Sequence, residues 1–481
     1  MPSSRNVAAE WEPTNYFIEE VRRRLLDDPR LGATEAARAE LLFGGGLRVH
    51  TTYDPAAQLA VEAAIDGLLP DDERAFAAAL AALEPGTGHV RALVGGPGFE
   101  VFEFNIATQK GRPTGSSFKP YVLAAAIEKG FVPDDLLNGT GPCEFANFGG
   151  FPDPYIANNF GEDDGSVATV RSQTLASSNC AYVRLGLAVG LSNVAATARA
   201  LGVTTDLSDL PISMPLGPKD VTPLDMATAY ATFANDGLQV DPIFITRVED
   251  RQGNVIFENA PRPERAISAQ SARLVTSVLE ANMRSGTGTR ARLPEQAAAG
   301  KTGTAQNFAD AWFVGYTPYL ATAVWMGNPD EQVPMTRVDR GPLGIGSVTG
   351  GSLPAMIWGA FNTGYHERLD PVPFVAPAST REGLRIRTDR EEDVYSEVIE
   401  SLCGPGNEDA EIDTDDDGLA DYCDPERSEF EFDPGIGECP ALYEPIDLDE
   451  DGALEGCTPP TTTTVPSSSS STTTTTQPLD E

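Results

Sequence analysis

Apolar residues recur along the chain with two different periods. The helical period, with an apolar residue every three or four positions, predicts helices at residues 16–26, 34–42, 55–69, 170–176, 222–235 and 267–283,. Alternating or continuous apolar runs predict strands at residues 47–53, 77–83, 89–94, 301–306, 311–316 and 319–326,. Residues 84–88, Glu-Pro-Gly-Thr-Gly, have the composition of a turn, so we expect a hairpin there,.

The most clearly marked helix is the one at residues 222–235. Thr222 is a capping residue, Pro223 falls at the first helical position, and Gly237 lies just past the end,. Two segments predict loops instead. Residues 138–164 are rich in glycine and proline, so we expect them to form one wall of a functional cleft, and residues 285–288 are expected to be flexible,.

A short polar stretch, residues 114–120, precedes a further apolar run. Gly115 permits a tight entry and Pro120 suits a first helical turn, so we place a helix start at Ser116,. Residues three apart share one helix face, where the Ser116 hydroxyl and the Lys119 amine can meet. A desolvated lysine can accept the serine proton, and a helix N-terminus favours an oxyanion. Alone, however, the pattern is common and its plain interpretation is a cap followed by a surface lysine.

Two further motifs follow in a fixed order. Ser177-Ser178-Asn179 comes after the helix at 170–176, and Lys301-Thr302-Gly303-Thr304 opens a predicted strand. The ordered set Ser-x-x-Lys, Ser-x-Asn and Lys-Thr-Gly is the signature of penicillin-binding proteins and serine β-lactamases. The chain resembles the transpeptidase domain of class A penicillin-binding proteins from about residue 16 to about residue 362. Other stretches that resemble this family are 88–96, 104–105, 107–109, 221–224, 229–230, 311–315 and 350–355.

The resemblance implies an α+β fold in which a cluster of helices packs against an antiparallel sheet. It places Lys301 and Thr304 along the sheet edge that faces the serine helix. Lys301, Thr302 and Thr304, with Gly303 between them, would receive the terminal carboxylate of a peptide substrate. The backbone amides of Ser116 and Thr304 would form the oxyanion hole, where each donor contributes about 3 kcal/mol.

The same resemblance implies a serine acyl-enzyme mechanism that needs no cofactor. Ser116 would attack the penultimate D-alanine carbonyl of a peptidoglycan stem peptide, and the terminal D-alanine would leave. Lys119 would take the serine proton, Ser177 would relay a proton to the departing amine, and Asn179 would bind a substrate amide. A second stem peptide would accept the acyl group, whereas β-lactams would mimic the donor and stay attached.

Several alternatives remain open. A D,D-carboxypeptidase of the same fold would use water as the acceptor, and a catalytically silent module would only bind wall fragments or β-lactams. Serine-histidine-aspartate chemistry is disfavoured because none of the three histidines, His50, His89 and His366, lies in a motif. A metallohydrolase is disfavoured by the absence of a His-Glu-x-x-His pattern, and a β-lactamase by the absence of a deacylating carboxylate motif,.

Charge is distributed unevenly along the 481 residues. The net charge is −38, and from Glu391 onward there are 27 acidic residues and a single basic residue, Arg427. The hydrophobic content of 41% is typical of a globular protein with a full core,. Nucleic acid is an unsuitable partner for so acidic a chain, because its binding requires a basic face.

Six cysteines suggest an oxidising compartment. Four of them, Cys403, Cys423, Cys439 and Cys457, lie in the acidic C-terminal region,. Because Cys180 directly follows Asn179, we hypothesise a bridge between Cys143 and Cys180.

No secretory signal and no apolar run long enough to span a membrane is visible,. The family carries a membrane anchor and a glycosyltransferase domain upstream of the point where this sequence begins. Either the true start lies upstream, which we favour, or this is a transpeptidase-only piece; in both cases we expect a cell-envelope location outside the cytoplasm.

The acidic region contains one loop pattern twice. Carboxylates at positions 1, 3, 5 and 9, with glycine at position 6, match loops that wrap a calcium ion and resemble thrombospondin type 3 repeats. Position 12 is Asp424 in the first copy but Thr458 in the second, so the second site should be weaker. A solvated acidic linker is the alternative. The candidate ligands are Asp413, Asp415, Asp417, Asp421, Asp424, Asp447, Asp449, Asp451 and Glu455.

The sequence therefore predicts five parts. These are an interdomain arm (1–46), a transpeptidase domain (47–375), a linker (376–402), acidic cysteine-containing repeats (403–457) and a disordered tail rich in threonine, serine and proline (458–481),.

Overall fold

The computed structural model describes residues 14–145 and 154–386, together with the backbone of four short strands at 411–412, 422–423, 444–446 and 456–458. The chain divides into two units, Met1–Val398 and Ile399–Glu481. In the second unit β19 (Glu411–Ile412) pairs with β20 (Tyr422–Cys423), and β21 (Glu444–Ile446) pairs with β22 (Gly456–Thr458), both antiparallel.

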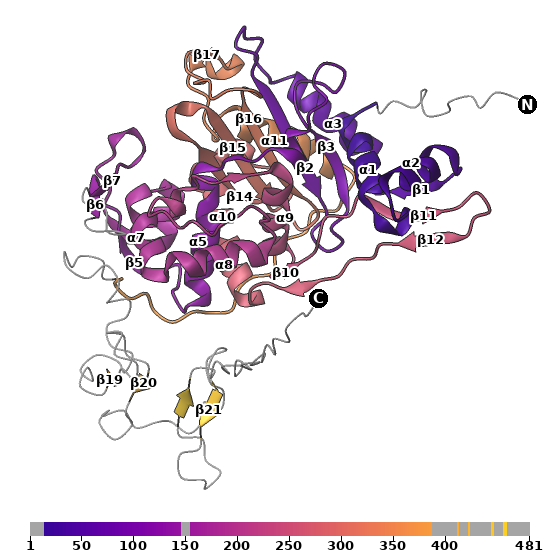
Figure 1. The fold of residues 1–481 in the computed structure, drawn as a ribbon. Coiled ribbons are helices and arrows are strands. Elements are labelled where there is room, and N and C mark those ends of the chain that lie inside the picture. Colours follow the sequence, from indigo (N-terminus) through magenta and orange to yellow (C-terminus); the bar gives the residue numbers. More distant parts are fainter. Residues whose placement is uncertain are drawn as a thin grey trace, which may run out of the picture. The chain divides into compact units, whose positions relative to one another are not determined.

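A five-stranded antiparallel sheet forms the centre of the first unit (Figure 1). Its order is β14 (Ala299–Thr304), β15 (Asp310–Tyr316), β16 (Ala321–Gly327), β2 (Ala77–Leu83) and β3 (Val90–Val94). Strands β2, β15 and β16 are buried along their whole length, because helices cover both faces of the sheet. Apart from Asp310 and Thr322, their sequences are therefore apolar and do not alternate,. The predicted hairpin at 84–88 is confirmed as the β2–β3 connection.

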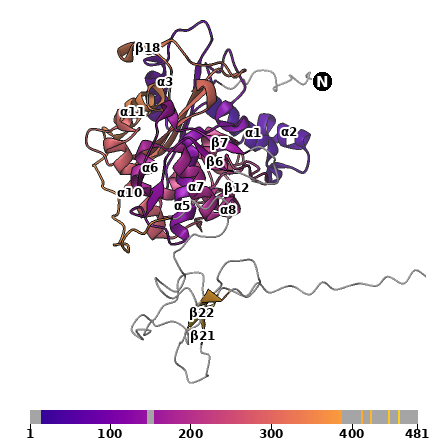
Figure 2. The same cartoon turned by 90° about the vertical axis from the view of Figure 1, so that its left-hand side faces the viewer.

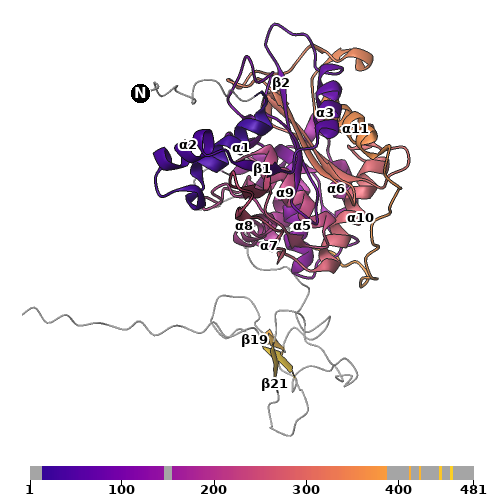
Figure 3. The same ribbon diagram turned by 90° about the vertical axis from the view of Figure 1, so that its right-hand side faces the viewer.

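Each face of the sheet has its own helices and its own apolar core. One face contacts α9 (Pro223–Ala234) and α10 (Ala269–Ser285), and the other contacts α3 (Pro55–Asp66) and α11 (Leu353–His366). Figure 3 shows α3 and α11 side by side on one side of the sheet. The residues of β2 divide accordingly, since Ala79 and Ala81 join one core and Ala78 and Leu80 the other. Successive side chains of a strand point to opposite faces, which accounts for this division.

A cluster of helices packs beyond α9 and α10. It contains α5 (Lys119–Glu128), α6 (Val170–Ala176), α7 (Asn179–Val189) and α8 (Leu191–Leu201). Helix α5 contacts α7, α8 and α10 and is buried from residue 119 to residue 127 (Figure 2). A helix enclosed on all sides is apolar all round, and the sequence 121–127 has this character. The α+β fold with a helical cluster and an antiparallel sheet is confirmed.

The N-terminal part of the described chain packs against this core. Phe17 of α1 (Tyr16–Asp27) is fully buried and its ring contacts Tyr53 and Phe244. A three-stranded sheet follows, formed by β1 (Arg48–Thr51), β11 (Ile245–Glu249) and β12 (Val255–Glu258). The remaining elements are α2 (Glu35–Gly44), α4 (Ile106–Gln109), β4 (Arg112–Pro113), β5 (Leu136–Asn138), β6 (Cys143–Phe145), β7 (Tyr155–Ala157), β8 (Val167–Thr169), β9 (Asp220–Val221), β10 (Leu238–Gln239), β13 (Glu264–Arg265), β17 (Val338–Asp339), β18 (Ile345–Gly346) and short 3-10 turns.

The predicted helices and strands are present, with shifts of a few residues at their ends. The start of the helix near Ser116 differs for a reason that lies in the sequence. The helix expected from Ser116 begins as a 3-10 turn, η3 (Gly115–Phe118), and becomes α-helical only at Lys119. Pro120 has no N–H to give to Ser116 O, so Lys119 N makes the bond one residue earlier,.

Of the two predicted loops, 138–164 contains regular structure, and 285–288, which we expected to be flexible, is held by hydrogen bonds. Residues 138–164 contain the β6–β7 pair and a 3-10 turn, η5 (Phe160–Glu162), although 146–153 lie outside the described residues. Thr287, which we expected to be flexible, donates from its N–H to Asn282 Oδ1 at 3.0 Å, and Gly288 N donates to Asn282 O. A buried asparagine thus fixes a segment whose composition alone indicates mobility.

Residues 372–386 form a strap across the first unit. Val372 N donates to Gln296 Oε1, and Arg381 makes two bonds to the carboxylate of Asp135, at 2.7 and 2.9 Å. At its end Ile386 is buried and donates from its N–H to Leu136 O. The segment that we expected to be a linker from 376 is therefore attached to the domain as far as 386.

Among the described residues no single helix is long and apolar enough to cross a membrane. Helices α7 and α8 meet the length and composition criteria only when taken together, and they are bent by 94°.

Candidate active site

The serine expected to be the nucleophile lies in the 3-10 turn η3. Because such a turn has three residues per turn, Ser116 and Lys119 eclipse each other on one face,. The turn is fixed from the core side, where the Tyr230 hydroxyl donates to Ser117 O at 2.6 Å. Ser116 is partly exposed whereas its neighbours Ser117 and Phe118 are buried, so the turn presents Ser116 outward.

Two glycines allow this turn to pack directly against the edge strand β14. Gly115 has φ of +53°, and a Cβ added there would lie 2.6 Å from Thr304 O. A Cβ on Gly303 would overlap Thr114 O. Side chains at either position would separate the turn from the strand. The Gly of the Lys-Thr-Gly motif is therefore required for close backbone approach.

Lys119 is completely buried and connects the serine turn with the Ser177–Asn179 motif. Its Nζ donates to Ser177 O at 2.7 Å, to Ser178 O at 3.1 Å and to Asn179 Oδ1 at 2.9 Å. Burial, and after it the positive charge of Lys301, holds the pKa of Lys119 well below its usual value. An amine that gives up its proton readily is suited to act as a base towards a serine hydroxyl.

Ser177 lies between two lysines. Its Oγ accepts from Lys301 Nζ at 2.8 Å and from Lys119 Nζ at 3.5 Å. Since both lysines donate to this oxygen, the hydroxyl hydrogen of Ser177 is left to donate elsewhere. The residue ends α6 in the left-handed conformation, with φ of +56° and ψ of +35°. Such backbone is unfavourable for serine.

Lys301 is also completely buried, and burial lowers its pKa to about 7. The residue beside it belongs to a chain of side-chain hydrogen bonds. Thr302 Oγ1 donates to Thr287 Oγ1 at 2.7 Å, and Thr287 Oγ1 donates to Asn282 Oδ1 at 3.2 Å. Asn282 in turn donates from Nδ2 to Gly300 O at 2.8 Å, so it is anchored to β14 itself. In this arrangement the Thr302 hydroxyl hydrogen points along the chain of bonds.

Thr304 has both its hydroxyl and its amide available at the edge of the sheet. Its Oγ1 accepts from Gly350 N at 3.1 Å, which leaves the hydroxyl hydrogen to donate,. Ala305 N donates to Asp310 O at 2.9 Å. Because hydrogen-bonded and non-hydrogen-bonded pairs alternate in an antiparallel ladder, Thr304 N–H is directed away from β15,. That orientation is suited to a donor of an oxyanion hole.

Comparisons with known proteins decide the family. A family profile described as the penicillin binding protein transpeptidase domain matches residues 78–332, more than half of the chain. The chain belongs to the penicillin-binding protein transpeptidase family. It is 33% identical to penicillin-binding protein 1A of Aquifex aeolicus over 260 residues, and 33% identical to penicillin-binding protein 2D of Bacillus subtilis over 339 residues. These alignments cover 54% and 68% of this chain but only 35% and 46% of the relatives, so the chain spans less than half of their length.

The transpeptidase fold is also found among solved structures. The penicillin-binding protein PonA1 of Mycobacterium tuberculosis is similar, with a TM-score of 0.67 and 28% identity over 78% of this chain and 98% of that chain. PonA1 in complex with penicillin V matches with a TM-score of 0.67, 27% identity and coverage of 76% and 97%.

The structure gathers all the predicted catalytic and substrate-binding residues of this transpeptidase domain at the junction of η3, β14 and α7. Hydrogen bonds join Lys119, Ser177, Asn179, Lys301 and Thr302 directly, and the turn that contains Ser116 packs against Gly303 and Thr304. The predicted calcium ligands, Asp413 to Glu455, lie outside the described residues. Within residues 14–145 and 154–386 no group of three or more histidine, cysteine or acidic side chains could hold a metal ion.

Sequence reasoning did not find the residues that support these motifs. Asn159 and Asn158 bond to the Ser177–Asn179 turn, Thr287 bonds to Thr302, and Asn282 bonds to Gly300. Each is a short polar residue in a loop or in a helix interior, and its partner lies 15 or more residues away. A single sequence carries no signal for such contacts. Only the glycine-rich character of 138–164 indicated that this loop borders a site.

A separate cavity of about 810 Å³ lies where α1, its following turn and β11 meet, and no predicted catalytic residue lines it. Its arginines are largely paired, since Arg23 and Arg24 share the buried Glu20 and Arg30 pairs with Asp28. We therefore assign no substrate to it.

Proposed function

We propose that the chain is a serine D,D-transpeptidase that cross-links peptidoglycan stem peptides and is acylated by β-lactams. The observation that supports this most is the Ser177 hydroxyl between the buried amines of Lys119 and Lys301. Two buried lysines near the partly exposed Ser116 form a base and an anion-binding group in one place,.

In the proposed reaction Ser116 Oγ attacks the carbonyl carbon of the penultimate D-alanine. Lys119 removes the serine proton, and the carbonyl oxygen becomes an oxyanion bound by the N–H groups of Ser116 and Thr304. The carbon–nitrogen bond then breaks, Ser177 passes a proton to the departing amine and receives the proton held by Lys119 in return, and D-alanine leaves. The amine of a second stem peptide attacks the ester and restores Ser116. Asn179 would align the donor peptide.

The substrate carboxylate would bind at β14. Lys301 supplies the cation, and Thr304 has a hydroxyl hydrogen free to donate. Thr302 would take part only after its hydroxyl turns away from Thr287, because in the free protein it donates there. We therefore propose Lys301 and Thr304 as the principal carboxylate ligands and Thr302 as an auxiliary one, with Gly303 serving close packing.

The first test is covalent labelling by a fluorescent penicillin. We expect stable labelling of the purified chain that is lost in Ser116→Ala. Failure of the well-folded wild-type chain to label would reject the proposal in favour of a silent binding module.

A stem pentapeptide with and without an amine acceptor then separates the two enzyme activities. A cross-linked dimer identifies a transpeptidase, whereas a shortened monomeric peptide as the sole product identifies a carboxypeptidase.

We propose an extracytoplasmic location in the cell envelope, which the Cys143–Cys180 disulfide supports,. The same proposal includes an upstream membrane anchor and glycosyltransferase domain. The greater length of the relatives is consistent with such additional parts.

We also propose that the acidic repeats bind calcium in the millimolar range. Strands β19 and β20 enclose residues 413–421, and β21 and β22 enclose residues 447–455, so each pattern is framed in the same way. Calorimetric titration of the whole chain with Ca²⁺ should detect uptake that Asp413→Asn combined with Asp447→Asn weakens. No uptake by the wild-type chain would leave the region as an acidic linker.

A further inference from the structure

The N-terminus of α7 is capped from a distant part of the chain. The first N–H groups of a helix have no partner within the helix and must find one elsewhere. Ser178 Oγ accepts from Ala181 N at 3.2 Å, which is an ordinary local cap. Asn179 N and Cys180 N, however, donate to Asn159 Oδ1, at 2.9 and 3.2 Å, and Ser178 Oγ donates to the same oxygen at 3.0 Å. One carboxamide oxygen thus accepts three hydrogen bonds from the second motif.

The carboxamide of Asn159 is itself held in one orientation. Only 7% of Asn159 is exposed, and its Nδ2 donates to Gly139 O at 2.9 Å and to Asp163 O at 3.1 Å. With carbonyl oxygens on one side and N–H and O–H donors on the other, only this orientation satisfies every partner. A Cβ added to Gly141 would lie 3.1 Å from this Nδ2, so the surrounding loop is closely packed.

Asn158, the residue before Asn159, is linked through Asn179 to Lys119, the candidate base. Asn179 Nδ2 donates to Asn158 O at 2.8 Å, while Asn179 Oδ1 accepts from Lys119 Nζ at 2.9 Å. The side chain of Asn179 is therefore clamped between the 157–163 segment and Lys119. Any movement of Asn158 and Asn159 changes the position of the group that binds the lysine amine.

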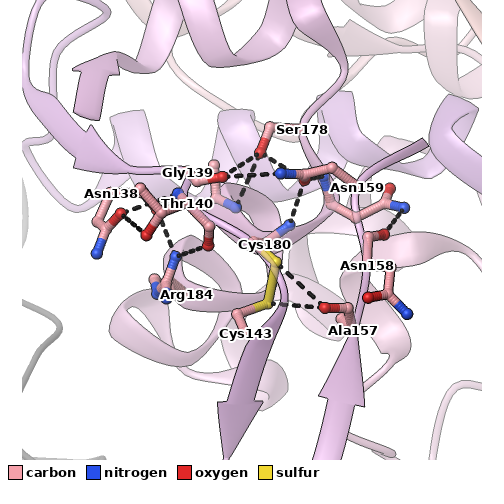
Figure 4. Close-up of a disulfide and its surroundings, with 12 residues drawn as sticks. Asn138, Gly139, Thr140, Cys143, Ala157, Asn158, Asn159, Ser178, Cys180 and Arg184 are labelled. Atoms are coloured by element: carbon pink, nitrogen blue, oxygen red, sulfur yellow. Dashed lines mark hydrogen bonds between the residues drawn. A yellow bond between two sulfur atoms is a disulfide. The ribbon is translucent and has the colours of Figure 1, made fainter. Parts of the chain in front are cut away.

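A disulfide attaches this segment to α7. Cys143 of β6 is bonded to Cys180 of α7, as we hypothesised, with Cα atoms 5.7 Å apart. Figure 4 shows Ser178, Asn159 and the disulfide gathered within one small region. Both sulfur atoms lie close to the backbone oxygen of Ala157, and this residue directly precedes Asn158 and Asn159. The hairpin and the motif are thus joined by a covalent bond and by hydrogen bonds.

We propose that Asn159 is a positioning residue of the active site, which fixes the Ser177–Asn179 turn and through it Lys119, and that the Cys143–Cys180 disulfide holds it in place. The proposal rests on the serine acylation chemistry proposed above. It assigns Asn159 no contact with substrate. Its effect should therefore appear in the rate of acylation more than in the affinity for the acylating compound.

The test is Asn159→Ala in the full chain, acylated by a fluorescent penicillin. We expect the first-order acylation rate to fall by about 10- to 100-fold, the usual effect of misplacing a catalytic group by about 1 Å, with a smaller change in the dissociation constant. The matched control is Asn193→Ala. Asn193 also bonds to α7, donating to Val189 O at 2.8 Å, but at the opposite end of the helix. Its removal should leave the acylation rate unchanged.

Asn159→Asp distinguishes positioning from plain stabilisation. A carboxylate still accepts the three hydrogen bonds, although it loses the two that Nδ2 donates to Gly139 O and Asp163 O. It also adds a negative charge near Lys119, which favours the protonated amine and raises the pKa of Lys119. The pH profile of acylation should shift to higher pH. A purely structural residue would change the melting temperature without this shift, and that result would overturn the proposal. If Asn159→Ala does not fold, the pH profile of Asn159→Asp decides alone.

Amide hydrogen exchange provides a measurement that does not depend on acylation. In Asn159→Ala the amides of Asn179 and Cys180 should exchange faster, because they have lost their acceptor. Unchanged exchange at these two amides would contradict the inference even in a protein that labels normally. The two proposals can also fail separately. If the wild-type chain does not label but the two amides exchange faster in Asn159→Ala, the positioning role is supported and the proposed function is rejected.

The disulfide can be removed independently. The double change Cys143→Ala and Cys180→Ala should lower the acylation rate by less than Asn159→Ala does, because the hydrogen bonds of Asn159 remain. An unchanged rate would remove the disulfide from the proposal.

Discussion

At the scale of single residues, the site depends on charged and polar groups placed where water cannot reach them. Lys119 and Lys301 are both fully buried, and this burial lowers the pKa of each below the usual value for lysine. Ser177 adds a strained backbone, in the left-handed region, to this arrangement. Each feature costs stability and each places a reactive group, so the two effects can be separated by substitution.

Ser177→Gly and Ser177→Ala should separate strain from chemistry. Both remove the hydroxyl, so both should strongly slow acylation and turnover. Glycine adopts a φ of +56° without a steric penalty, so Ser177→Gly should be more stable than Ser177→Ala by about 1 kcal/mol,. Chemical denaturation measures this difference. Equal stability of the two variants would contradict the assignment of strain to residue 177.

The buried amine of Lys301 predicts a pH dependence of stability. Its pKa is about 7 in the folded chain, while an unfolded lysine titrates near 10.5. Between these values the unfolded state binds one more proton, so the free energy of unfolding should rise as the pH increases from 7 to 9. Below about pH 7 both states are protonated and this contribution is constant. Urea denaturation at several pH values should show a smaller rise for Lys301→Met than for the wild type.

At the scale of elements, the site is formed where the turn η3 packs against the edge strand β14. A strand edge normally needs a cover, and here the cover carries Ser116, the proposed nucleophile. Strand β14 is almost wholly buried although it is an edge strand. The close approach depends on glycine at positions 115 and 303.

Gly303→Ala should therefore disturb both stability and acylation. The added Cβ would overlap Thr114 O, and relief requires the turn to move away from β14. We expect a loss of about 1–3 kcal/mol in the free energy of unfolding and a large fall in labelling. Gly364→Ala is the matched control, because that glycine lies in α11 with no atom near its Cβ position. The control should label normally and be as stable as the wild type or more so.

Elements with strong local signals could be predicted from the sequence, and those decided by distant contacts could not. Thr222 and Pro223 mark the start of α9, and the structure has Thr222 Oγ1 as its cap. The 3-10 turn at Ser116 could have been derived from the missing N–H of Pro120, but its packing depends on β14. Asn159 and Asn282 are recognisable only once the chain is folded, because most of their partners are backbone groups that any sequence supplies.

At the scale of the whole molecule, the domain ends later than its composition indicates. The strap of residues 372–386 returns to β5 and buries Ile386 beside Leu136. Asp135, only 1% exposed, receives its ion pair from Arg381 within this strap. The strongly acidic segment begins only after these contacts are complete.

Two truncations test where the domain ends. A chain that ends at Val398 should keep the melting temperature and the labelling rate of the domain, since it retains every contact described for the first unit. A chain that ends at Asp370 should lose about 2 kcal/mol or more, because it loses the burial of Ile386, and burying one such side chain contributes about that much,. Differential scanning calorimetry compares them. Equal melting of the two truncated chains would show that the strap contributes nothing.

The proximity of the two buried amines has a consequence for how variants at position 301 are interpreted. The charge of Lys301 is one of the causes of the low pKa of Lys119, so replacing Lys301 with a neutral residue makes Lys119 a group that holds its proton more tightly. Such a variant should react slowly even with an acyl donor that has no carboxylate to recognise. Drug tolerance arising at this position would then combine weaker capture of the antibiotic with a less reactive serine, and affinity measurements alone would account for only the first.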